Sequence, residues 1–371
     1  MAIDHNGDMK VQGLSLRALP KVSLHDHLDG AVRPETIIDL AGAAGIETPA
    51  KDAAGLRRWF AQQCGAGSLP AYLKTFELVA AVTQTEAALT RIAREYVADL
   101  AADGVIYGEV RWAPEQHTVG GLSPNRAVAA VQRGLEEGEE EAEAAGRSIR
   151  ISQILSAMRQ GDRSLEIARL AVANREHGVV AFDIAGPEDG FPASRHREAF
   201  DYLASEFLPV TVHAGEGAGS ASIRSALIDG RALRLGHGVR IAEDLQVIER
   251  EGDDVQVQFG DLARWVRDRE IPLEISPSSN LQTGAIAQWG DEAADHPFDL
   301  LYQLGFAVTV NTDNRTMSAT TLTRELGLLV DAFEYDLDDL EVFQFNAASA
   351  AFLPVEEREE LVEMIAEGFE R

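Results

Sequence analysis

Thr211-Val-His-Ala-Gly-Glu216 is the segment that decides the fold prediction, because an apolar run stops in it at a histidine, two small residues and a glutamate. The run over residues 209–212 is typical of a buried strand. Small residues directly after a strand let a ligand come close to the backbone. His213 and Glu216 are therefore two chemically useful side chains at the end of a strand, and three other strand-like runs of this chain end in a similar way.

Length, composition and charge limit the class of protein. The chain has 371 residues, enough for one large barrel or two ordinary domains, and its 45% hydrophobic content allows a sizeable core. A formal net charge of -28 would repel phosphate backbones, so we expect no nucleic-acid partner. The single cysteine, Cys64, excludes an intramolecular disulfide.

The start of the chain and its apolar runs bear on location. The first ten residues lack the apolar core of a signal peptide, and no apolar run reaches the length of a membrane span. We therefore expect a cytoplasmic protein without a membrane partner. The sequence carries no indication of oligomeric state.

Eight strand-like runs alternate with helical segments along the chain. The runs cover residues 22–28, 105–113, 149–157, 179–184, 209–212, 233–238, 272–276 and 306–314. We expect helices over residues 33–44, 68–76, 85–103, 124–145, 165–176, 195–207, 220–227, 242–251, 262–269, 298–304, 322–335, 340–352 and 356–369. This alternation predicts an α/β fold, a single (β/α)8 TIM-type barrel with extra helices over residues 14–371, after a flexible N-terminal tail over residues 1–13.

A doubly wound sheet is the alternative architecture. Such a sheet usually carries a glycine-rich phosphate loop after its first strand. The first strand of this chain is followed instead by His25-Asp-His-Leu-Asp-Gly30, which is not such a loop. The barrel is therefore the favoured fold.

His25 and His27 lie two residues apart on the first expected strand, so both side chains point to the same face. Two imidazoles on one face suit a metal ion. The same pair is also compatible with ordinary polar residues at the end of a strand. Considered alone, the pair leaves both interpretations open.

A second ambiguous segment is the expected helix over residues 68–76. Its apolar residues follow a spacing of three and four, which places them on one helix face: Leu69, Tyr72, Leu73 and Phe76. Core packing is the ordinary explanation of such a face. A lid over an apolar ligand is the functional alternative.

The expected barrel gathers the unusual strand ends at one place, because the C-terminal ends of all strands meet at one mouth. Four of the nine histidines of the chain lie at these ends, with two carboxylates: His25, His27, His213, His237, Glu216 and Asp313. Packing alone rarely produces such a coincidence, so we predict a metal site there. Three imidazoles and a carboxylate, with one position left for water, describe a catalytic zinc site.

The number of metal ions follows from the lysines. Barrel hydrolases with two metals often bridge them with a carboxylated lysine. None of the lysines of this chain lies near the fourth expected strand: Lys10, Lys21, Lys51 and Lys74. We therefore expect one zinc ion per subunit.

From about Leu19 to Phe352 the chain resembles the adenosine deaminase family of the metal-dependent amidohydrolase superfamily. The resemblance rests on motifs that occur in order: Ser23-Leu-His-Asp-His-Leu-Asp-Gly30, Ser68-Leu-Pro-Ala-Tyr-Leu73, Gly108-Glu-Val-Arg-Trp-Ala-Pro114, Phe182-Asp-Ile-Ala-Gly186, His213-Ala-Gly-Glu216, Gly236-His-Gly238, Ser276-Pro-Ser-Ser-Asn280 and Asn311-Thr-Asp313. It implies zinc-dependent hydrolysis of adenosine and 2′-deoxyadenosine to inosine and 2′-deoxyinosine, with release of ammonia, in purine salvage.

The resemblance also implies a role for each site residue. The zinc ligands would be His25, His27, His213 and Asp313. His237 would orient or deprotonate the attacking water, with Asp313 accepting a hydrogen bond from it, and Glu216 would donate a proton to purine N1. The substrate contacts would be His27, Asp29, Gly186 and Asn314, with Leu69, Tyr72, Leu73 and Phe76 as the lid.

One position departs from the animal members of the family. They have a second aspartate directly after the metal-binding aspartate, whereas this chain has Asn314 followed by Arg315. Purine N7 is an acceptor, and an asparagine amide can donate to it at any pH, whereas an ionised carboxylate cannot. We therefore expect the contact with N7 to be kept.

Three other functions fit parts of the pattern. The substrate could be a different 6-aminopurine, such as adenine or aminodeoxyfutalosine. A mononuclear amidohydrolase that opens cyclic amides would use the same metal ligands, but Glu216 directly after Ala-Gly argues against it. A non-catalytic nucleoside-binding protein would be expected to have lost a ligand or the acid, and this chain has both.

Overall fold

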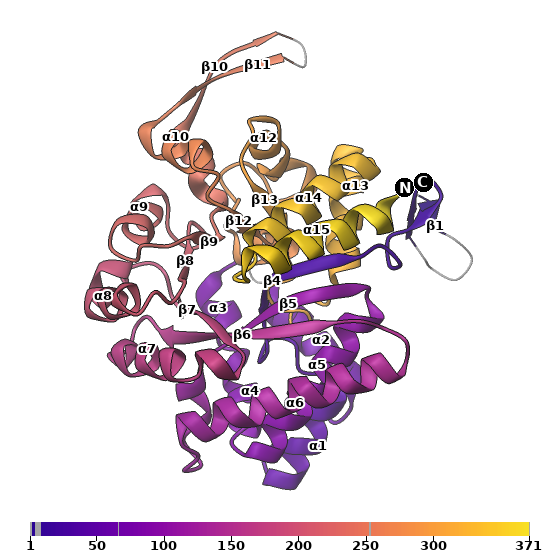
Figure 1. The fold of residues 1–371 in the computed structure, drawn as a ribbon, viewed down its shortest axis with the longest axis vertical. Coiled ribbons are helices and arrows are strands. Elements are labelled where there is room, and N and C mark those ends of the chain that lie inside the picture. The colour runs from indigo at the N-terminus through magenta and orange to yellow at the C-terminus, as the bar shows by residue number, and fades with distance from the viewer. Residues whose placement is uncertain (1, 4–8, 66, 252–253, 371) are drawn as a thin grey trace.

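The computed structural model describes residues 2–3, 9–65, 67–251 and 254–370. Within these residues, eight parallel strands form a closed barrel (Figure 1): β4 (Lys21–His27), β5 (Val105–Trp112), β6 (Arg150–Met158), β7 (Val179–Ala185), β8 (Thr211–Ala214), β9 (Arg234–His237), β12 (Leu273–Ile275) and β13 (Val308–Val310). β4 to β7 pair in sequence order, and so do β8, β9, β12 and β13.

Two isolated bridges join these two groups of strands. Phe182 of β7 pairs with Val210 just before β8, and Asp26 of β4 pairs with Asp313 just after β13. The second bridge closes the circle between the first and the last strand. The predicted (β/α)8 barrel is therefore confirmed.

Helices surround the barrel and alternate with its strands (Figure 1). Their bounds are α1 (Pro34–Ala44), α2 (Ala53–Cys64), α3 (Leu69–Leu73), α4 (Phe76–Val82), α5 (Glu86–Ala102), α6 (Pro124–Ala144), α7 (Ser164–Ala173), α8 (Arg197–Ser205), α9 (Ser220–Ile228), α10 (Asp261–Asp268), α11 (Pro277–Thr283), α12 (Phe298–Gln303), α13 (Leu322–Phe333), α14 (Leu337–Ala350) and α15 (Val355–Phe369). A hydrophobic cluster extends from Val11 to Phe369, so these helices share a core with the strands.

Local sequence explains where several helices begin. Thr85 precedes α5, and its side chain accepts a hydrogen bond from the N–H of Ala88, which satisfies one of the free donors of the first turn. Asp336 and Asp339 form a reciprocal capping box at the start of α14. α5 begins one residue after its predicted start, and α14 begins three residues before its predicted start.

The predicted helix over residues 242–251 is wrong. The 3-10 segment η4 (Val239–Asp244) leads into β10 (Leu245–Glu251), which pairs antiparallel with β11 (Asp254–Phe259), and this hairpin projects from the barrel (Figure 1). The physical reason is the partner strand, because Leu245 lies opposite Phe259 and Val247 lies opposite Val257. Such cross-strand apolar pairs stabilise a hairpin, and a helix would lose them.

The structure also differs from the prediction in the segment expected to be a lid and at the N-terminus. The predicted helix over residues 68–76 is divided into α3 and the start of α4. Within the predicted flexible tail, β1 (Ala2–Ile3) and β2 (Met9–Val11) form a small antiparallel sheet with β3 (Leu14–Ser15), and Val11 is buried. Residues 1 and 4–8 of that tail lie outside the described residues.

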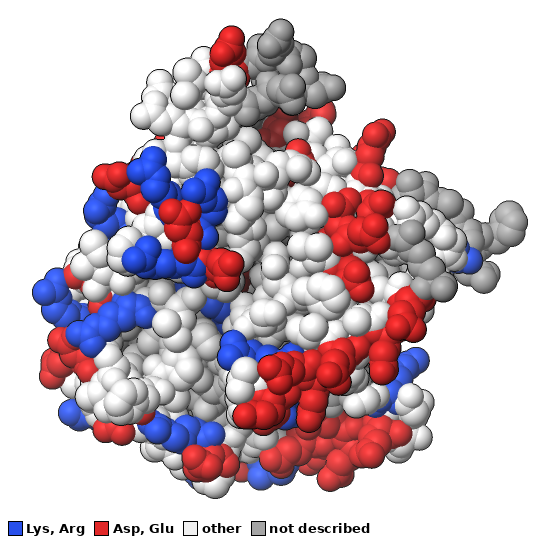
Figure 2. Space-filling view, turned by 45° about the horizontal axis from the view of Figure 1, so that its top comes forward, with Lys and Arg blue, Asp and Glu red and all other residues white. Residues whose placement is uncertain are grey.

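Charged residues are distributed unevenly. Acidic side chains gather on one half of the face shown in Figure 2, whereas Lys and Arg lie mainly on the other half.

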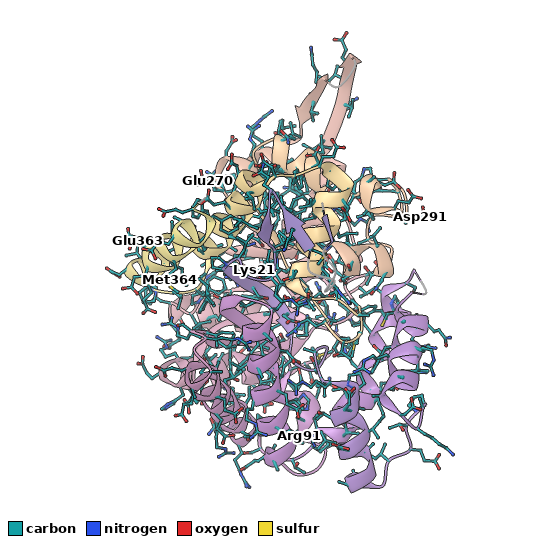
Figure 3. All side chains as sticks on the ribbon, turned by 90° about the vertical axis from the view of Figure 1, so that its right-hand side faces the viewer. Lys21, Arg91, Glu270, Asp291, Glu363 and Met364 are labelled. Atoms are coloured by element: carbon teal, nitrogen blue, oxygen red, sulfur yellow. The ribbon has the colours of Figure 1, made fainter. Side chains whose placement is uncertain are left out.

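Lys21 is a charged residue that is buried. It lies among the strands, whereas Asp291 and Glu363 lie at the outside of the molecule (Figure 3). Its ammonium group donates to the carbonyl oxygens of Leu16 and Leu19, both at 2.7 Å. These bonds compensate for its burial.

The hydrophobicity of the helices bears on membrane association. No helix in the part of the chain that the structure describes is long and apolar enough to cross a membrane.

Candidate active site

The end of β4 and the segment after β13 lie side by side, which brings two histidines next to Asp313. The N–H of Asp313 donates to the carbonyl of His25 at 2.9 Å, and the N–H of His27 donates to the carbonyl of Asp313 at 2.7 Å. The side chains also meet, because Oδ1 of Asp313 is 3.4 Å from Nε2 of both histidines. The closure of the barrel therefore assembles this half of the site.

The histidines of β8 and β9 complete the cluster. Nε2 of His213 is 3.2 Å from Nε2 of His27, and the rings of His213 and His237 are 5.6 Å apart. One ligand atom from each of four buried residues lies within 4.8 Å of the others: His25, His213, His237 and Asp313. His27 also belongs to the cluster through its contact with His213, so all four histidines singled out in the sequence converge.

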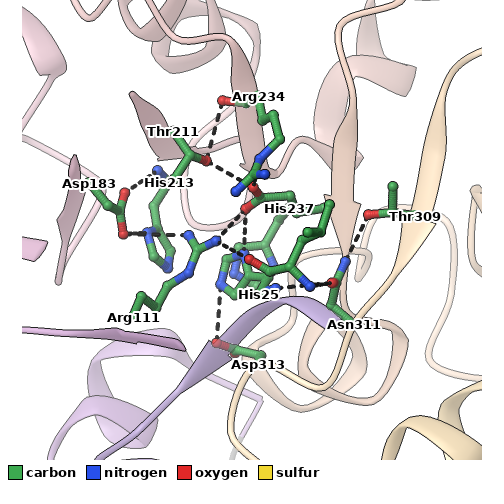
Figure 4. Close-up of polar contacts among 12 residues, drawn as sticks. His25, Arg111, Asp183, Thr211, His213, Arg234, His237, Thr309, Asn311 and Asp313 are labelled. Atoms are coloured by element: carbon green, nitrogen blue, oxygen red, sulfur yellow. Dashed lines mark hydrogen bonds and ion pairs between the residues drawn. The ribbon is translucent and has the colours of Figure 1, made fainter. Parts of the chain in front are cut away.

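Buried carboxylates fix the orientation of two of these rings. Nδ1 of His25 lies 3.0 Å from Oε2 of Glu274, and Nδ1 of His213 lies 2.8 Å from Oδ2 of Asp183. His25 therefore directs Nε2 toward Asp313, a contact drawn in Figure 4, and His213 directs Nε2 toward His27. This pattern is typical of histidines that bind a metal through one nitrogen and a carboxylate through the other.

The donor set fits a metal ion. Nε2 of His25 is buried and has no hydrogen-bond partner, which is costly unless a ligand uses its lone pair. Burial raises the pKa of Asp313, but the contacts with His25 and His237 outweigh it and hold the pKa well below the usual range. The residues thus offer imidazole nitrogens and a carboxylate oxygen, which are ligand types that zinc binds.

Backbone strain marks two residues of this cluster. His237 has a φ of 64° and Asp313 a φ of 56°, both in the left-handed region that residues other than glycine rarely adopt. His237 ends β9, and Asp313 lies three residues after the end of β13. Such strain tends to gather at functional sites, where the surrounding structure imposes it.

Glu216 lies beside the cluster in a form suited to proton donation. Its Oε2 is 3.6 Å from Nε2 of His237, and the residue is only 6% exposed. Burial, followed by the negative charges of Asp313 and Glu188, raises the pKa of Glu216 well above its usual value. This environment favours the protonated form of the carboxyl group.

Glu188 holds the turn that carries Glu216. One of its oxygens accepts from the N–H of Gly215 at 2.7 Å. The other accepts from the N–H groups of Glu216, Gly217 and Ala218 at 3.0, 2.6 and 3.0 Å. Four backbone donors on one buried carboxylate fix the course of this turn, and with it the base of the Glu216 side chain.

A pocket of about 420 Å³ opens onto the cluster, and its walls include every residue predicted to contact substrate: His27, Asp29, Leu69, Tyr72, Leu73, Phe76, Gly186 and Asn314. Gly186 has a φ of 104°, and a Cβ on it would lie 2.6 Å from the Gln160 side-chain oxygen. Because φ is positive, any residue with a side chain would be strained at this position. The segment expected to be a lid is attached to the loop between β13 and α13, because the hydroxyl groups of Tyr72 and Ser318 lie 2.8 Å apart.

Sequence reasoning assigned no role to several residues that shape the site: Asp183, Glu188, Glu274, Asn280 and His296. Glu274 and Asp183 each interrupt an apolar strand with a carboxylate, which is the signal that could have identified them. Arg111 contacts both carboxylates at 2.7 and 3.5 Å, which compensates for their charge inside the barrel. Glu188 and His296 have no comparable signal in the sequence.

An α/β barrel with imidazoles and carboxylates at the C-terminal ends of its strands is an arrangement suited to metal-dependent hydrolysis. Residues 20–368 match a family model described as adenosine deaminase. The chain is 52% identical to "Adenosine deaminase 1" of Streptomyces coelicolor over 92% of this chain and 85% of that protein. It is 49% identical to "Adenosine deaminase" of Mycobacteroides abscessus over 93% of both. The chain belongs to the adenosine deaminase family.

Solved structures agree with this family. An adenine deaminase from Arthrobacter aurescens superposes with a TM-score of 0.81 at 25% identity, over 94% of this chain and 99% of that one. An N6-mAMP deaminase from Arabidopsis superposes with a TM-score of 0.79 at 26% identity, over 95% and 99%. The fold is thus shared by deaminases that are named for different aminopurines.

Proposed function

We propose that this chain catalyses the hydrolytic deamination of adenosine and 2′-deoxyadenosine to inosine and 2′-deoxyinosine, with release of ammonia, as a step of purine salvage. The observation that carries the proposal is the position of Glu216, a buried residue of the pocket wall that lies 3.6 Å from His237 of the imidazole cluster. A protonated carboxyl group beside a hydrolytic centre acts as a general acid. The pocket volume of about 420 Å³ lies in the range of small-ligand sites.

The metal that suits this site is one Zn²⁺ ion per subunit, with His25, His27, His213 and Asp313 as its ligands. When bound, zinc supplies a water molecule whose pKa it lowers toward about 7. His237 orients the attacking water, and Asp313 accepts a hydrogen bond from it. Glu216 gives its proton to purine N1, which makes C6 more electrophilic. The water oxygen forms the new bond to C6, and the bond between C6 and the amino nitrogen breaks. Of the two water hydrogens, one leaves with the amino group as ammonia and the other restores the acid form of Glu216.

The other walls of the pocket recognise the nucleoside. The N–H of Gly186 donates to purine N3, the carboxyl group of Asp29 meets the ribose 5′-hydroxyl, and the amide of Asn314 donates to N7. An apolar lid covers the remaining side and excludes water: Leu69, Tyr72, Leu73 and Phe76. These contacts assign each end of adenosine to a different part of the pocket.

The direct test measures ammonia release and product identity for the zinc-loaded protein with adenosine, 2′-deoxyadenosine, adenine, AMP and aminodeoxyfutalosine. We expect the highest kcat/KM for adenosine and 2′-deoxyadenosine, with inosine and 2′-deoxyinosine as products. Faster turnover of another aminopurine would refute the substrate assignment. Ring opening without ammonia release would refute the reaction.

The role of Glu216 is tested by Glu216→Gln, which keeps the size of the side chain but carries no acidic proton. We expect bound zinc to be unchanged and kcat to fall by roughly 10²–10⁴, the usual contribution of a positioned acid. Glu139→Gln is a matched control, because Glu139 accepts the Ile151 N–H at 2.7 Å on the outer helix α6, away from the pocket. Full activity of Glu216→Gln would contradict the assignment.

A further inference from the structure

A chain of hydrogen bonds behind the site begins at a backbone amide. The N–H of Phe298, at the start of α12, lies 3.0 Å from Nδ1 of His296. A backbone N–H can only donate, so Nδ1 of His296 accepts and carries no hydrogen. The hydrogen of this ring is therefore on Nε2. Burial, which lowers the pKa of His296 to about 3, keeps the ring neutral.

The next member of the chain is Asn280 on α11. Its side-chain oxygen lies 3.2 Å from Nε2 of His296, and its nitrogen lies 2.9 Å from Nδ1 of His237. The Nε2–H of His296 must meet an acceptor, which the amide oxygen of Asn280 provides. With the amide turned over, its NH2 group would face the Nε2–H of His296, and two donors would meet without an acceptor.

This orientation of Asn280 fixes the state of His237. The NH2 group of Asn280 donates, so Nδ1 of His237 accepts and carries no hydrogen. The hydrogen of this ring is therefore on Nε2, the nitrogen that lies 3.6 Å from Glu216 and faces the pocket. All three residues of the relay are at most 3% exposed, so water does not replace these bonds: His237, Asn280 and His296.

We propose that His296, acting through Asn280, is a positioning residue that keeps the hydrogen of His237 on Nε2. His237 then donates a hydrogen bond to the attacking water oxygen and holds it in place, and it does not remove a proton from it. Of the two roles expected for His237, orientation is the one that this geometry allows. The effect on rate rests on the proposed function, whereas the hydrogen position on the ring does not.

The test reads the hydrogen positions directly. Long-range ¹H–¹⁵N NMR spectra of protein labelled with ¹⁵N-histidine distinguish a ring nitrogen that carries a hydrogen from one that does not. We expect His237 and His296 to carry the hydrogen on Nε2, in both the metal-free and the zinc-loaded protein. A hydrogen on Nδ1 of His237 in the unmodified protein would overturn the proposal.

Variants separate the relay from general packing. In Asn280→Asp the side chain only accepts, so the hydrogen of His237 should move to Nδ1. In His296→Gln the amide can accept from Phe298 and donate to Asn280, so the hydrogen should stay on Nε2. His296→Leu removes the donor, and Asn280 should then adopt both orientations and give a mixture. His117→Leu, which removes another buried histidine outside this relay, should leave His237 unchanged.

Turnover of adenosine gives the second readout. For Asn280→Asp and His296→Leu we expect kcat to fall roughly 10–100-fold, the usual cost of losing a partner that fixes a histidine tautomer. KM should change little, because neither residue is part of the pocket wall, and His296→Gln should retain activity. An unchanged hydrogen on Nε2 in Asn280→Asp, or unchanged kcat in His296→Leu, would overturn the proposal.

The design also separates two kinds of failure. If no aminopurine is turned over but the hydrogen positions are as expected, the proposed function fails and the relay stands. If adenosine is deaminated and the hydrogen lies on Nδ1 of His237, the function stands and the relay fails. Should Asn280→Asp not fold, the unmodified protein and His296→Gln still decide the question.

Discussion

Replacing Glu188 with glutamine tests how the turn that carries Glu216 is held. In the native protein one oxygen of Glu188 accepts three N–H groups and the other accepts the N–H of Gly215. The amide oxygen of glutamine can keep the set of three, but its NH2 group must then face the Gly215 N–H. A buried donor left without an acceptor costs about 1–3 kcal/mol.

The magnitude follows from that single unsatisfied donor. If the turn relaxes and the cost falls entirely on the transition state, 1–3 kcal/mol corresponds to a decrease in kcat of about 5–150-fold. Stability should fall by a similar free energy if the cost falls on the native state instead. Steady-state kinetics and thermal unfolding of Glu188→Gln, with Glu139→Gln as the control, measure both.

The pH profile distinguishes an electrostatic role from a structural one. The negative charge of Glu188 is one cause of the raised pKa of Glu216, after burial and Asp313. A general acid must be protonated, so activity is lost as the pH rises through its pKa. Removing the charge of Glu188 lowers that pKa, and the alkaline limb of kcat against pH should move to lower pH. An unchanged limb, or one that moves to higher pH, would refute the reasoning.

Three further predictions address metal, pH and substrate contacts. Removal of metal by a chelator should abolish deamination and lower Tm, and added zinc should restore both; a chelated protein with full activity would contradict the metal site. Burial lowers the pKa of His117 from 6.5 to about 4, so its neutral form adds stability that is lost as the pH falls from 6.5 to 4. His117→Gln should remove roughly 3 kcal/mol of that pH dependence in urea unfolding at pH 7 and pH 4, and an unchanged difference would contradict it. Asn314→Asp should raise KM for adenosine increasingly as the pH rises, because an ionised carboxylate cannot donate to N7; a KM independent of pH would argue against this contact.

Local sequence was sufficient to predict the barrel fold and to identify the residues that gather at its mouth. The period-two pattern of β4 places His25 and His27 on one face, and His213 lies at the end of β8, directly before small residues. Because the barrel brings all strand ends together, the histidines could be grouped without coordinates. The hairpin of β10 and β11 was missed for the opposite reason, since its residues are strands only through pairing with each other.

Tertiary structure alone decided how the grouped residues are held. His25 meets Glu274 across 249 positions of the sequence, Glu216 is fixed by Glu188 across 28, and His237 meets Asn280 across 43. A sequence pattern reports which face of a strand a side chain occupies, because that depends on neighbouring residues. It does not report which donor meets which acceptor, because hydrogen bonds are directional and depend on how distant segments pack. The type of chemistry was therefore readable from the sequence, whereas the hydrogen positions and the ionisation of the groups that perform it depend on the folded barrel.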